Sequence, residues 1–332
     1  MFEEIAENIK KYCPDAWVIN YTNPMAVCVK TLYTTFPEIK AFGCCHEVFG
    51  TQKLLATVLD EMLGITDVKR EEVKVNVLGI NHFTWLTKAN YKNIDIIPLY
   101  RKFCEKYAEI GWNVKSDTNW ANDFWEYAEK VKMDLFLRYG YIAAAGDRHL
   151  AEFCEKKWYL DSREHVAKMK FGLTPVSFRK QCLKDRLAKS ENLVSGKEEV
   201  KIEETGEEGV NQMRALLGLC DLVTNVNIPN QGQIPNLPIG AVVETNASFT
   251  SDSLTPVFAG EIPANILPLI SRVCVEQTLT VKAAVERDLD LAFSVFCNDP
   301  LVDLTVEDAK KLFDEMIDNT KEYLKMYEIK SI

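Results

Sequence analysis

The first 64 residues alternate between short apolar runs and segments with helical features, and this alternation constrains the fold more than any other feature. Residues 16–20 and 39–42 are short and apolar, as expected of strands buried on both faces. A helix is expected after each run. After the first run, Asn23 suits an N-cap with Pro24 at the first helical position. After the second run, residues 48–64 are expected to form a helix. The β-α-β-α order predicts a doubly wound parallel sheet.

The next part of the chain departs from this order. Residues 73–77 carry valine at every second position, which is typical of a strand, and that strand ends at Asn81-His82. Residues 83–91 indicate another strand that leaves the parallel pattern. The chain is then mainly helical up to about residue 220, and residues 221–250 are rich in strand patterns and in Asn, Pro and Gly. We therefore expect an α/β chain whose second part is α+β.

The glycine fingerprint of dinucleotide-binding domains is missing from this sequence. Such a domain opens with a strand, a G-x-G-x-x-G turn and a helix, whereas this chain opens with a helical pattern and contains no such turn. We therefore assign no cofactor-binding residue. Either the sheet is completed in another way, or the chain lacks the first strands of such a domain.

Charge and cysteine content exclude several classes of protein. The net charge of −10 disfavours nucleic-acid and anionic-membrane partners, because phosphate binding needs a basic surface. No apolar run approaches the roughly 18 residues of a membrane span. The ten cysteines form no C-x-x-C pair, and the acidic N-terminus is not an export signal. We expect reduced thiols and a cytoplasmic protein.

Cysteine and histidine stand at the predicted ends of two strands, which is where open α/β sheets bind ligands. A thiolate from Cys45 and an imidazole from His82 can hold a divalent ion while leaving positions open for substrate. A buried cysteine beside a hydrogen-bonded histidine is an equally good interpretation of the same spacing.

Four further residues have both a chemical and a structural interpretation. Asp147 can act as a general base, with Arg148 beside it for a substrate anion, or the two can form a surface ion pair. Asn23 and Asn81 can bind substrate or simply shape turns. The amide-rich residues 227–238 suit sugar hydroxyls but also suit a connecting loop.

Together these stretches resemble glycoside hydrolase family four, the NAD- and metal-dependent glycosidases. The order and approximate spacing agree over nearly the whole chain. Within that family the chain most resembles the α-galacturonidase-type members, which carry Cys-His-Glu-Val-Phe-Gly after the strand. The matching stretches are Asn20-Tyr-Thr-Asn23-Pro24, Gly43-Cys44-Cys45-His46, Gly79-Ile-Asn81-His82-Phe-Thr-Trp85, Gly146-Asp147-Arg148-His149-Leu-Ala-Glu152-Phe153 and Val226-Asn227-Ile-Pro-Asn230-Gln-Gly232.

The resemblance implies roles for the residues at the strand ends. Cys45 and His82 match the family's metal ligands, usually for Mn²⁺, although another divalent metal can serve. Asn23 and Asn81 match residues that contact substrate hydroxyls near the metal. A thiolate ligand is unusual for Mn²⁺, because soft sulfur favours zinc and manganese prefers oxygen.

The resemblance also implies a mechanism. The sugar is oxidised at C3 by NAD, the C2 proton is removed, the glycosidic oxygen leaves by elimination, and water then adds. Asp147 falls at the position of the family's base, and His46 at that of a proposed general acid. Arg148 is compatible with the carboxylate of a uronate, so the expected substrate is a small saccharide that contains a uronate.

The domain organisation implied by the resemblance has two parts. Residues 1–80 correspond to the end of a Rossmann-like doubly wound sheet. Residues 81–332 correspond to an α+β domain of the lactate/malate dehydrogenase C-terminal type, which carries the substrate and metal site and the oligomer contacts of a homodimer or tetramer. Family members begin with a glycine-rich segment that is absent here.

Two alternatives stay open. A malate- or lactate-type dehydrogenase shares the fold and would accumulate NADH with a 2-hydroxy acid, but that chemistry does not require Cys45 with His82. A truncated, inactive fragment of a family-four glycosidase would keep the site residues without the cofactor cradle.

Overall fold

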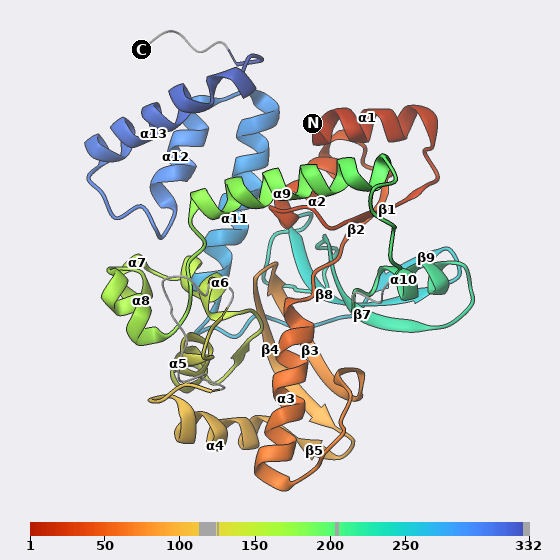
Figure 1. Cartoon of the computed structure of the whole chain (residues 1–332), viewed down its shortest axis with the longest axis vertical. Coiled ribbons are helices and arrows are strands. Elements are labelled where there is room, and N and C mark those ends of the chain that lie inside the picture. The colour runs from red at the N-terminus through yellow and green to blue at the C-terminus, as the bar shows by residue number, and fades with distance from the viewer. Residues whose placement is uncertain (113–123, 125, 203–205, 328–332) are drawn as a thin grey trace.

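The computed structural model describes residues 1–112, 124, 126–202 and 206–327 (Figure 1). The predicted alternation at the N-terminus is confirmed, and strand β1 (Trp17–Asn20) runs parallel to strand β2 (Lys40–Gly43). The helix predicted to begin at Pro24 begins at Met25, because Pro24 has an extended backbone with ψ of 117°, and the Asn23 side chain accepts the Met25 amide at 3.2 Å. The first elements are α1 (Phe2–Tyr12), β1 (Trp17–Asn20), α2 (Met25–Thr35), β2 (Lys40–Gly43) and α3 (Glu47–Leu63).

Strands from the far end of the chain complete the first sheet, whose order is β1-β2-β7-β8-β9. They are β7 (Leu222–Pro229), β8 (Val242–Thr250) and β9 (Ser253–Pro256), and they join in antiparallel fashion. Gly43 of β2 lies opposite Asn227 of β7, and a Cβ on Gly43 would lie only 2.3 Å from the Met25 sulfur. Glycine therefore allows α2 and β7 to pack closely against the end of β2.

The second sheet is a hairpin with two short additions. Its main strands are β3 (Val73–Ile80), which follows the turn η1 (Arg70–Glu72), and β4 (Phe83–Tyr91). Because Ile80 pairs with Phe83, only Asn81 and His82 form the turn. The short strands β5 (Ile94–Asp95) and β6 (Ile142–Ala143) both pair with β4.

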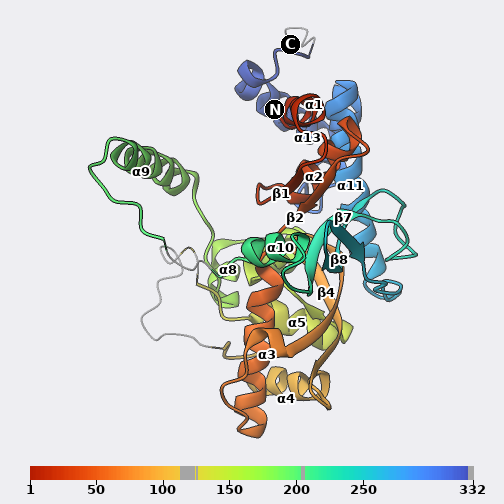
Figure 2. The ribbon, with the colours of Figure 1, turned by 90° about the vertical axis from the view of Figure 1, so that its right-hand side faces the viewer.

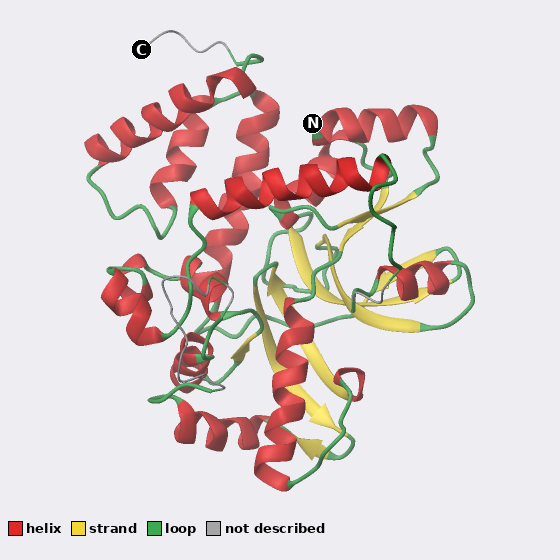
Figure 3. Ribbon diagram, viewed as in Figure 1, coloured by secondary structure: helices red, strands yellow, loops and turns green. Residues whose placement is uncertain are grey.

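Helices surround the two sheets (Figure 3). Those of the middle of the chain are α4 (Ile97–Tyr107), α5 (Lys130–Tyr139), α6 (Asp147–Glu152), α7 (Lys156–Tyr159), α8 (Arg163–Met169), α9 (Val176–Val194) and α10 (Gly209–Leu216). The C-terminal ones are α11 (Leu267–Glu286), α12 (Leu289–Asn298), α13 (Val306–Thr320) and η2 (Lys321–Tyr323). No helix in the described part of the chain has the length and apolar character needed to cross a bilayer.

The hydrophobic core ties the two sheets together. Its largest cluster surrounds the fully buried Phe83 and Trp85 of β4 and includes Val243 of β8 and Ile270 of α11. The α/β class, with a Rossmann-like first sheet and an α+β second part, is confirmed. The predicted boundary at residue 80 falls in the β3–β4 turn, so the division into 1–80 and 81–332 stays a prediction.

Candidate active site

A cavity of about 520 Å³ opens where the parallel strands β1 and β2 end. This is the edge at which open α/β sheets bind ligands. The loops after both strands line it, together with the β3–β4 turn, the start of α6 and the start of α9. The described lining residues are Tyr21, Asn23, Met25, Cys44, Cys45, His46, Glu47, His82, Phe124, Glu126, Tyr127, Gly146, Arg148, His149, Gly172, Arg179 and Glu207.

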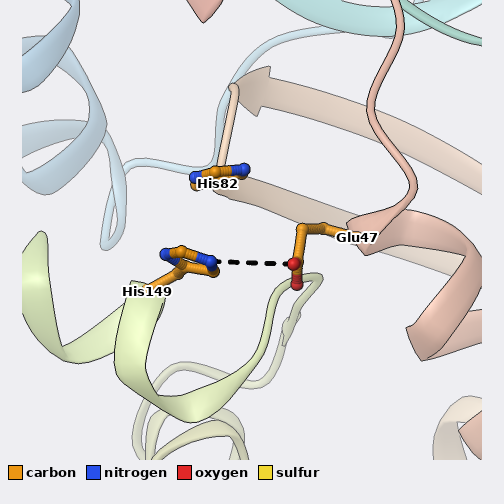
Figure 4. A group of neighbouring side chains, drawn as sticks. All are labelled: Glu47, His82 and His149. Carbon is orange, nitrogen blue, oxygen red and sulfur yellow. Dashed lines mark ion pairs between the residues drawn. The ribbon is translucent and has the colours of Figure 1, made fainter. Parts of the chain in front are cut away.

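Three side chains with metal-ligating atoms converge in this cavity (Figure 4). One ligand atom from each of Glu47, His82 and His149 lies within 4.8 Å of the other two. The carboxylate oxygen Oε1 of Glu47 is 3.7 Å from Nε2 of His149. The rings of His82 and His149 are stacked with their centroids 4.1 Å apart. We call these residues the Glu-His-His group.

Each member of the Glu-His-His group comes from a different element. Glu47 is the first residue of α3, and its Oε2 accepts the Gly146 amide at 2.8 Å. His82 sits in the two-residue turn between β3 and β4 with φ of 63°, a left-handed conformation that is uncommon outside glycine. His149 is on α6, and its Nδ1 lies 3.4 Å from Glu152. The group therefore depends on tertiary folding rather than on local sequence.

The charges around the group act in both directions, because Glu47 is anionic while the Arg148 guanidinium nitrogen Nη2 lies 3.4 Å from Nε2 of His149. Burial alone would raise the pKa of the Glu47 carboxyl, but His149 and the Gly146 amide lower it below its ordinary value. Burial, with His149 nearby, lowers the pKa of His82 to about 4. At neutral pH Glu47 is therefore an anion and His82 a neutral imidazole, which are the protonation states that metal ligation requires.

Two imidazoles and one carboxylate form a donor set known from divalent metal sites with open coordination positions. The carboxylate oxygen suits a hard ion such as Mn²⁺ better than a thiolate does. The residues present therefore fit a divalent cation.

Cys45 lines the same cavity as His82 but is not a member of the Glu-His-His group. Its thiol is hydrogen-bonded to the side chain of Asn81. Burial, with the Glu244 carboxylate nearby, raises the pKa of this thiol. The structure thus brings Cys45 and His82 to one cavity, and the assignment of Cys45 as a ligand stays a prediction.

A buried polar network lies behind Cys45, and we call it the Glu244 network. The Glu244 carboxylate is 1% exposed and accepts hydrogen bonds from Thr84 at 2.7 Å, Asn225 at 2.7 Å and Asn81 at 3.4 Å. Asn225 also donates to the carbonyl oxygen of Cys45 at 3.2 Å. The network holds the ends of β2 and β3 together. Asn81 therefore lies behind the cavity and is not among the described residues that line it.

Asp147 points away from the cavity. Its side chain is completely buried, and its Oδ1 accepts the amide of Lys132 in the first turn of α5 at 3.1 Å. The Lys132 ammonium forms a buried ion pair with Glu129 at 2.7 Å. Burial, reinforced by the Glu129 charge, raises the pKa of Asp147 to about 7. The neighbours Gly146 and Arg148 line the cavity, but Asp147 is not among the described lining residues.

The other predicted residues lie on the cavity wall. His46 is largely exposed, and its Nδ1 is 3.1 Å from Glu207. Arg148 donates to the Thr174 hydroxyl at 2.6 Å, which fixes its guanidinium at the wall. Asn23 lines the cavity beside the start of α2.

The amide-rich loop at residues 227–238 is a structural connection in this fold. The Asn230 side chain is fully buried and donates to the carbonyl oxygens of Ile234 and Leu237, each at 2.9 Å. None of the described residues of this loop lines the cavity. The interpretation of this loop as a sugar-binding element is therefore not supported.

Sequence reasoning missed several residues of the site. Glu47 immediately follows His46, and His149 immediately follows Arg148, but neither was given a role. The acidic and histidine residues next to the predicted strand ends were the available signal. Glu244 carried no signal, because a strand glutamate resembles any solvent-facing residue until its burial is known.

Comparisons with family models and known proteins match nearly the whole chain. The model described as "Family 4 glycosyl hydrolase" matches residues 1–61, and that described as "Family 4 glycosyl hydrolase C-terminal domain" matches residues 77–302. The α-galacturonidase of Thermoanaerobacterium saccharolyticum is 59% identical over 331 residues, covering 100% of this chain and 71% of that protein.

Two solved structures show the same fold. The glucosidase-like protein lplD of Bacillus subtilis has a TM-score of 0.88 and 49% identity, covering 95% of this chain and 71% of that one. A 6-phospho-α-glucosidase from gut microorganisms, solved with NAD and Mn²⁺, has a TM-score of 0.71 and 20% identity, covering 96% of this chain and 69% of that one.

Proposed function

The chain belongs to glycosyl hydrolase family 4, and from this premise we propose that it hydrolyses α-linked galacturonides with the help of a divalent metal ion and NAD. The relative at 59% identity is an α-galacturonidase, and the alignment covers the whole of this chain. The proposed substrate is a small saccharide that ends in a uronate.

The observation that carries the proposal is the Glu-His-His group in the cavity at the strand ends. Its three ligand atoms lie within 4.8 Å of one another, and the ionised Glu47 and neutral His82 are ready to bind a cation. A bound divalent ion supplies Lewis-acid polarisation of a substrate oxygen, and NAD supplies reversible hydride transfer. Glu47, His82 and His149 would hold the ion, with Cys45 on the same wall as a further ligand.

The remaining wall residues would bind the sugar. Arg148, fixed by the Thr174 hydroxyl, presents a planar guanidinium that suits the carboxylate of a uronate. Asn23 can hydrogen-bond a sugar hydroxyl. His46, exposed at the wall beside Glu207, can deliver a proton to a leaving oxygen.

The base of the reaction is proposed only from the family resemblance. Asp147 holds its carboxyl against the start of α5, and it would have to turn toward the cavity to take a proton from the sugar. For NAD, the 332 residues contain no G-x-G-x-x-G turn that would hold a pyrophosphate. We therefore assign no residue to NAD and derive no step through it.

The first experiment measures galacturonate release from an α-linked galacturonide by the purified, reduced chain with Mn²⁺ and NAD. We expect turnover that is lost when either Mn²⁺ or NAD is omitted. Net accumulation of NADH with a 2-hydroxy acid would instead indicate a dehydrogenase. Absence of turnover in a sample with a cooperative unfolding transition would count against activity of this chain.

A matched pair of histidine variants tests the site. His82→Ala removes a member of the Glu-His-His group, whereas His165→Ala removes a half-buried histidine that pairs with Asp161 outside the cavity. We expect only the first to lose Mn²⁺ binding, measured by electron paramagnetic resonance of the free ion, as well as turnover. Equal Mn²⁺ binding by both variants would overturn the site assignment.

A further inference from the structure

A second cavity, of about 610 Å³, borders the Glu244 network through Asn225. It is lined by the start of α3, by η1, by the first residues of β3 and β7, and by single residues next to α10 and on β8. Figure 2 shows the start of α3 next to α10 and β7. None of the described residues that line it also lines the metal cavity, as we call the space around the Glu-His-His group. We call this separate space the rear cavity.

Two amide side chains on the wall of the rear cavity each leave a carbonyl oxygen unused. Gln52 donates through Nε2 to the carbonyl oxygen of Val73 at 2.9 Å, and Asn246 donates through Nδ2 to that of Val75 at 2.8 Å. No described residue donates to Oε1 of Gln52 or to Oδ1 of Asn246, and neither oxygen is sealed inside the protein. Both oxygens can therefore accept a hydrogen bond from a ligand.

Asn225 of β7 shows the same arrangement at a nearly buried position. Only 3% of the residue is exposed, and it lines the rear cavity. Its Nδ2 donates to Glu244 at 2.7 Å and to the carbonyl oxygen of Cys45 at 3.2 Å, whereas its Oδ1 has no donor among the described residues. Because this oxygen is also not sealed inside the protein, its open side is the rear cavity. A molecule that satisfies the three amide oxygens must bring hydrogen-bond donors.

The charges on the wall favour a neutral molecule over an ion. Arg70 forms ion pairs with two carboxylates, with Glu71 at 3.0 Å and with Glu208, so its charge is compensated within the protein. Lys74 and Asp221, one of each sign and both exposed, remain on the wall. An anion would face the carboxylates and the amide oxygens, and a cation would face Lys74. A hydroxyl group can both donate to an amide oxygen and accept from an ammonium group.

Apolar side chains complete the wall of the rear cavity. Val48, Val75, Leu222 and Val223 line the same space as the three amides. Apolar surface combined with a few convergent polar groups, in a space of this size, is typical of small-molecule sites. The ring of a sugar, with C–H groups on its faces and hydroxyls around its edge, matches this combination.

Two residues connect the rear cavity to the metal cavity. Val48 lines the rear cavity and directly follows Glu47 at the start of α3. Asn225 holds the carbonyl oxygen of Cys45, a residue that lines the metal cavity. Hydrogen bonds in a chain polarise one another, so a hydroxyl that donates to Oδ1 of Asn225 strengthens the bonds from its Nδ2.

We propose that the rear cavity binds a small neutral sugar or polyol, whose hydroxyls donate to the amide oxygens of Gln52, Asn225 and Asn246. The bound molecule holds the end of β2 more firmly through Asn225, and it thereby raises the affinity of the Glu-His-His group for a divalent ion. This second step rests on the proposed function, because it assumes the metal site, whereas binding in the rear cavity does not.

The first test titrates D-galactose into the native chain without Mn²⁺ or NAD and follows the methyl NMR signals of valine and methionine. We expect shifts at Val75 and Val223, which line the rear cavity, whereas Met25 lines the metal cavity and reports binding there. The absence of shifts at the two valines, with or without a shift at Met25, would overturn the proposal. D-Galacturonate, the same ring with a carboxylate, should shift the valines only at higher concentration. Equal or tighter binding of D-galacturonate there would contradict a site for neutral ligands.

A matched pair of variants tests the rear cavity itself. Val223→Trp places an indole ring in this space, at a residue that is 63% exposed and can accept a larger side chain. Val306→Trp makes the same change at a valine that is 71% exposed at the start of α13, outside both cavities. We expect the galactose-induced shift at Val75 to be lost only in Val223→Trp. A shift that persists in this variant would overturn the proposal.

Titration of Mn²⁺ followed by electron paramagnetic resonance tests the second step. With saturating D-galactose, we expect the native chain and Val306→Trp to bind Mn²⁺ about fivefold more tightly, and Val223→Trp to show no change. Unchanged Mn²⁺ affinity in a native chain that binds both D-galactose and Mn²⁺ would overturn the action through Asn225. A native chain that binds no Mn²⁺ would contradict the proposed metal site instead, and the valine shifts would still decide whether the rear cavity binds a sugar.

Discussion

In the described part of the chain, two helices begin with a carboxylate residue, and the two carboxylates differ in what surrounds them. Glu47 opens α3 after strand β2, and Asp147 opens α6 after strand β6. Glu47 faces the cavity and lies beside His149, whereas Asp147 turns into the protein and accepts the Lys132 amide of α5. The pKa of Glu47 is lowered and the pKa of Asp147 is raised to about 7. The first position of a helix thus holds a candidate metal ligand in α3 and a buried acid in α6.

The difference follows from which charges face each group. Both carboxyls are buried enough for desolvation to favour the neutral acid. At Glu47 the imidazole of His149 and the Gly146 amide outweigh desolvation. At Asp147 the nearby Glu129 carboxylate adds to desolvation, and the Lys132 amide and ammonium offset only part of it. Desolvation raises the pKa of both carboxyls, and the neighbours of each decide whether that rise is overcome.

The largest effect on Mn²⁺ binding is expected for Glu47→Gln. The amide keeps the size of the side chain but removes the charge that faces the histidines, so Mn²⁺ affinity should fall by roughly 100-fold or more. Titration of Mn²⁺ followed by electron paramagnetic resonance measures this loss. Glu126→Gln is the matched control, because Glu126 lines the same cavity outside the Glu-His-His group. Equal losses of Mn²⁺ affinity in both variants would mean that Glu47 is not a metal ligand.

Asp147→Asn tests the other member of the pair. Because the folded-state pKa of Asp147 lies above its ordinary value of 3.8, its contribution to stability is complete below about pH 4 and is lost as the pH rises through about 7. We expect the variant to lack this loss, so its melting temperature should rise relative to the native chain between pH 4 and pH 7. Parallel melting curves of the two proteins over this range would contradict the assignment.

The same variant also tests the predicted base. If Asp147 removes the sugar proton, turnover should fall by about 10²- to 10⁴-fold while the fold is kept. A loss of that size would show that the side chain turns into the cavity during the reaction. Turnover within about threefold of the native rate would leave Asp147 as the residue that accepts the first amides of α5.

The comparison also shows what could be predicted from the sequence. Short apolar runs followed by helix starts indicated β1, α2, β2 and α3, because this pattern is local. The pairing of β2 with β7 could not be predicted, since it joins Gly43 to Asn227 across most of the chain. His82 and Cys45 were placed correctly at the strand ends. The direction of the Glu47 and Asp147 side chains was not accessible, because it depends on what packs against each helix start.

Glu244→Gln sharpens the comparison with a third carboxylate, one that is buried like Asp147 but bonded by three donors. Glutamine has one acceptor oxygen where glutamate has two, so either Asn225 or the pair Thr84 and Asn81 loses its acceptor behind Cys45. Groups that orient ligands in this way typically change metal affinity by 10- to 100-fold, and we expect about tenfold for this variant. Thr255→Ser, a mild change on β9 of the same sheet, serves as the control for a general effect on sheet stability. Unchanged Mn²⁺ affinity in Glu244→Gln would show that the Glu244 network only stabilises the fold.

The smallest effect is expected for Arg148→Lys, which keeps the positive charge next to Asp147 but removes the planar fork of donors. The guanidinium of Arg148 lies on the cavity wall and is held by Thr174. Lysine presents a point charge in place of two parallel donors, so KM for an α-galacturonide should rise about three- to tenfold with little change in kcat. The corresponding neutral α-galactoside is the internal control, since it has no carboxylate to bind and its KM should not change. An equal rise of KM for both substrates would mean that Arg148 shapes the cavity wall rather than recognising a uronate. Specificity for the uronate would then have to come from another residue of the wall. Arg179, in the first turn of α9, lines the same cavity and would be the next residue to test.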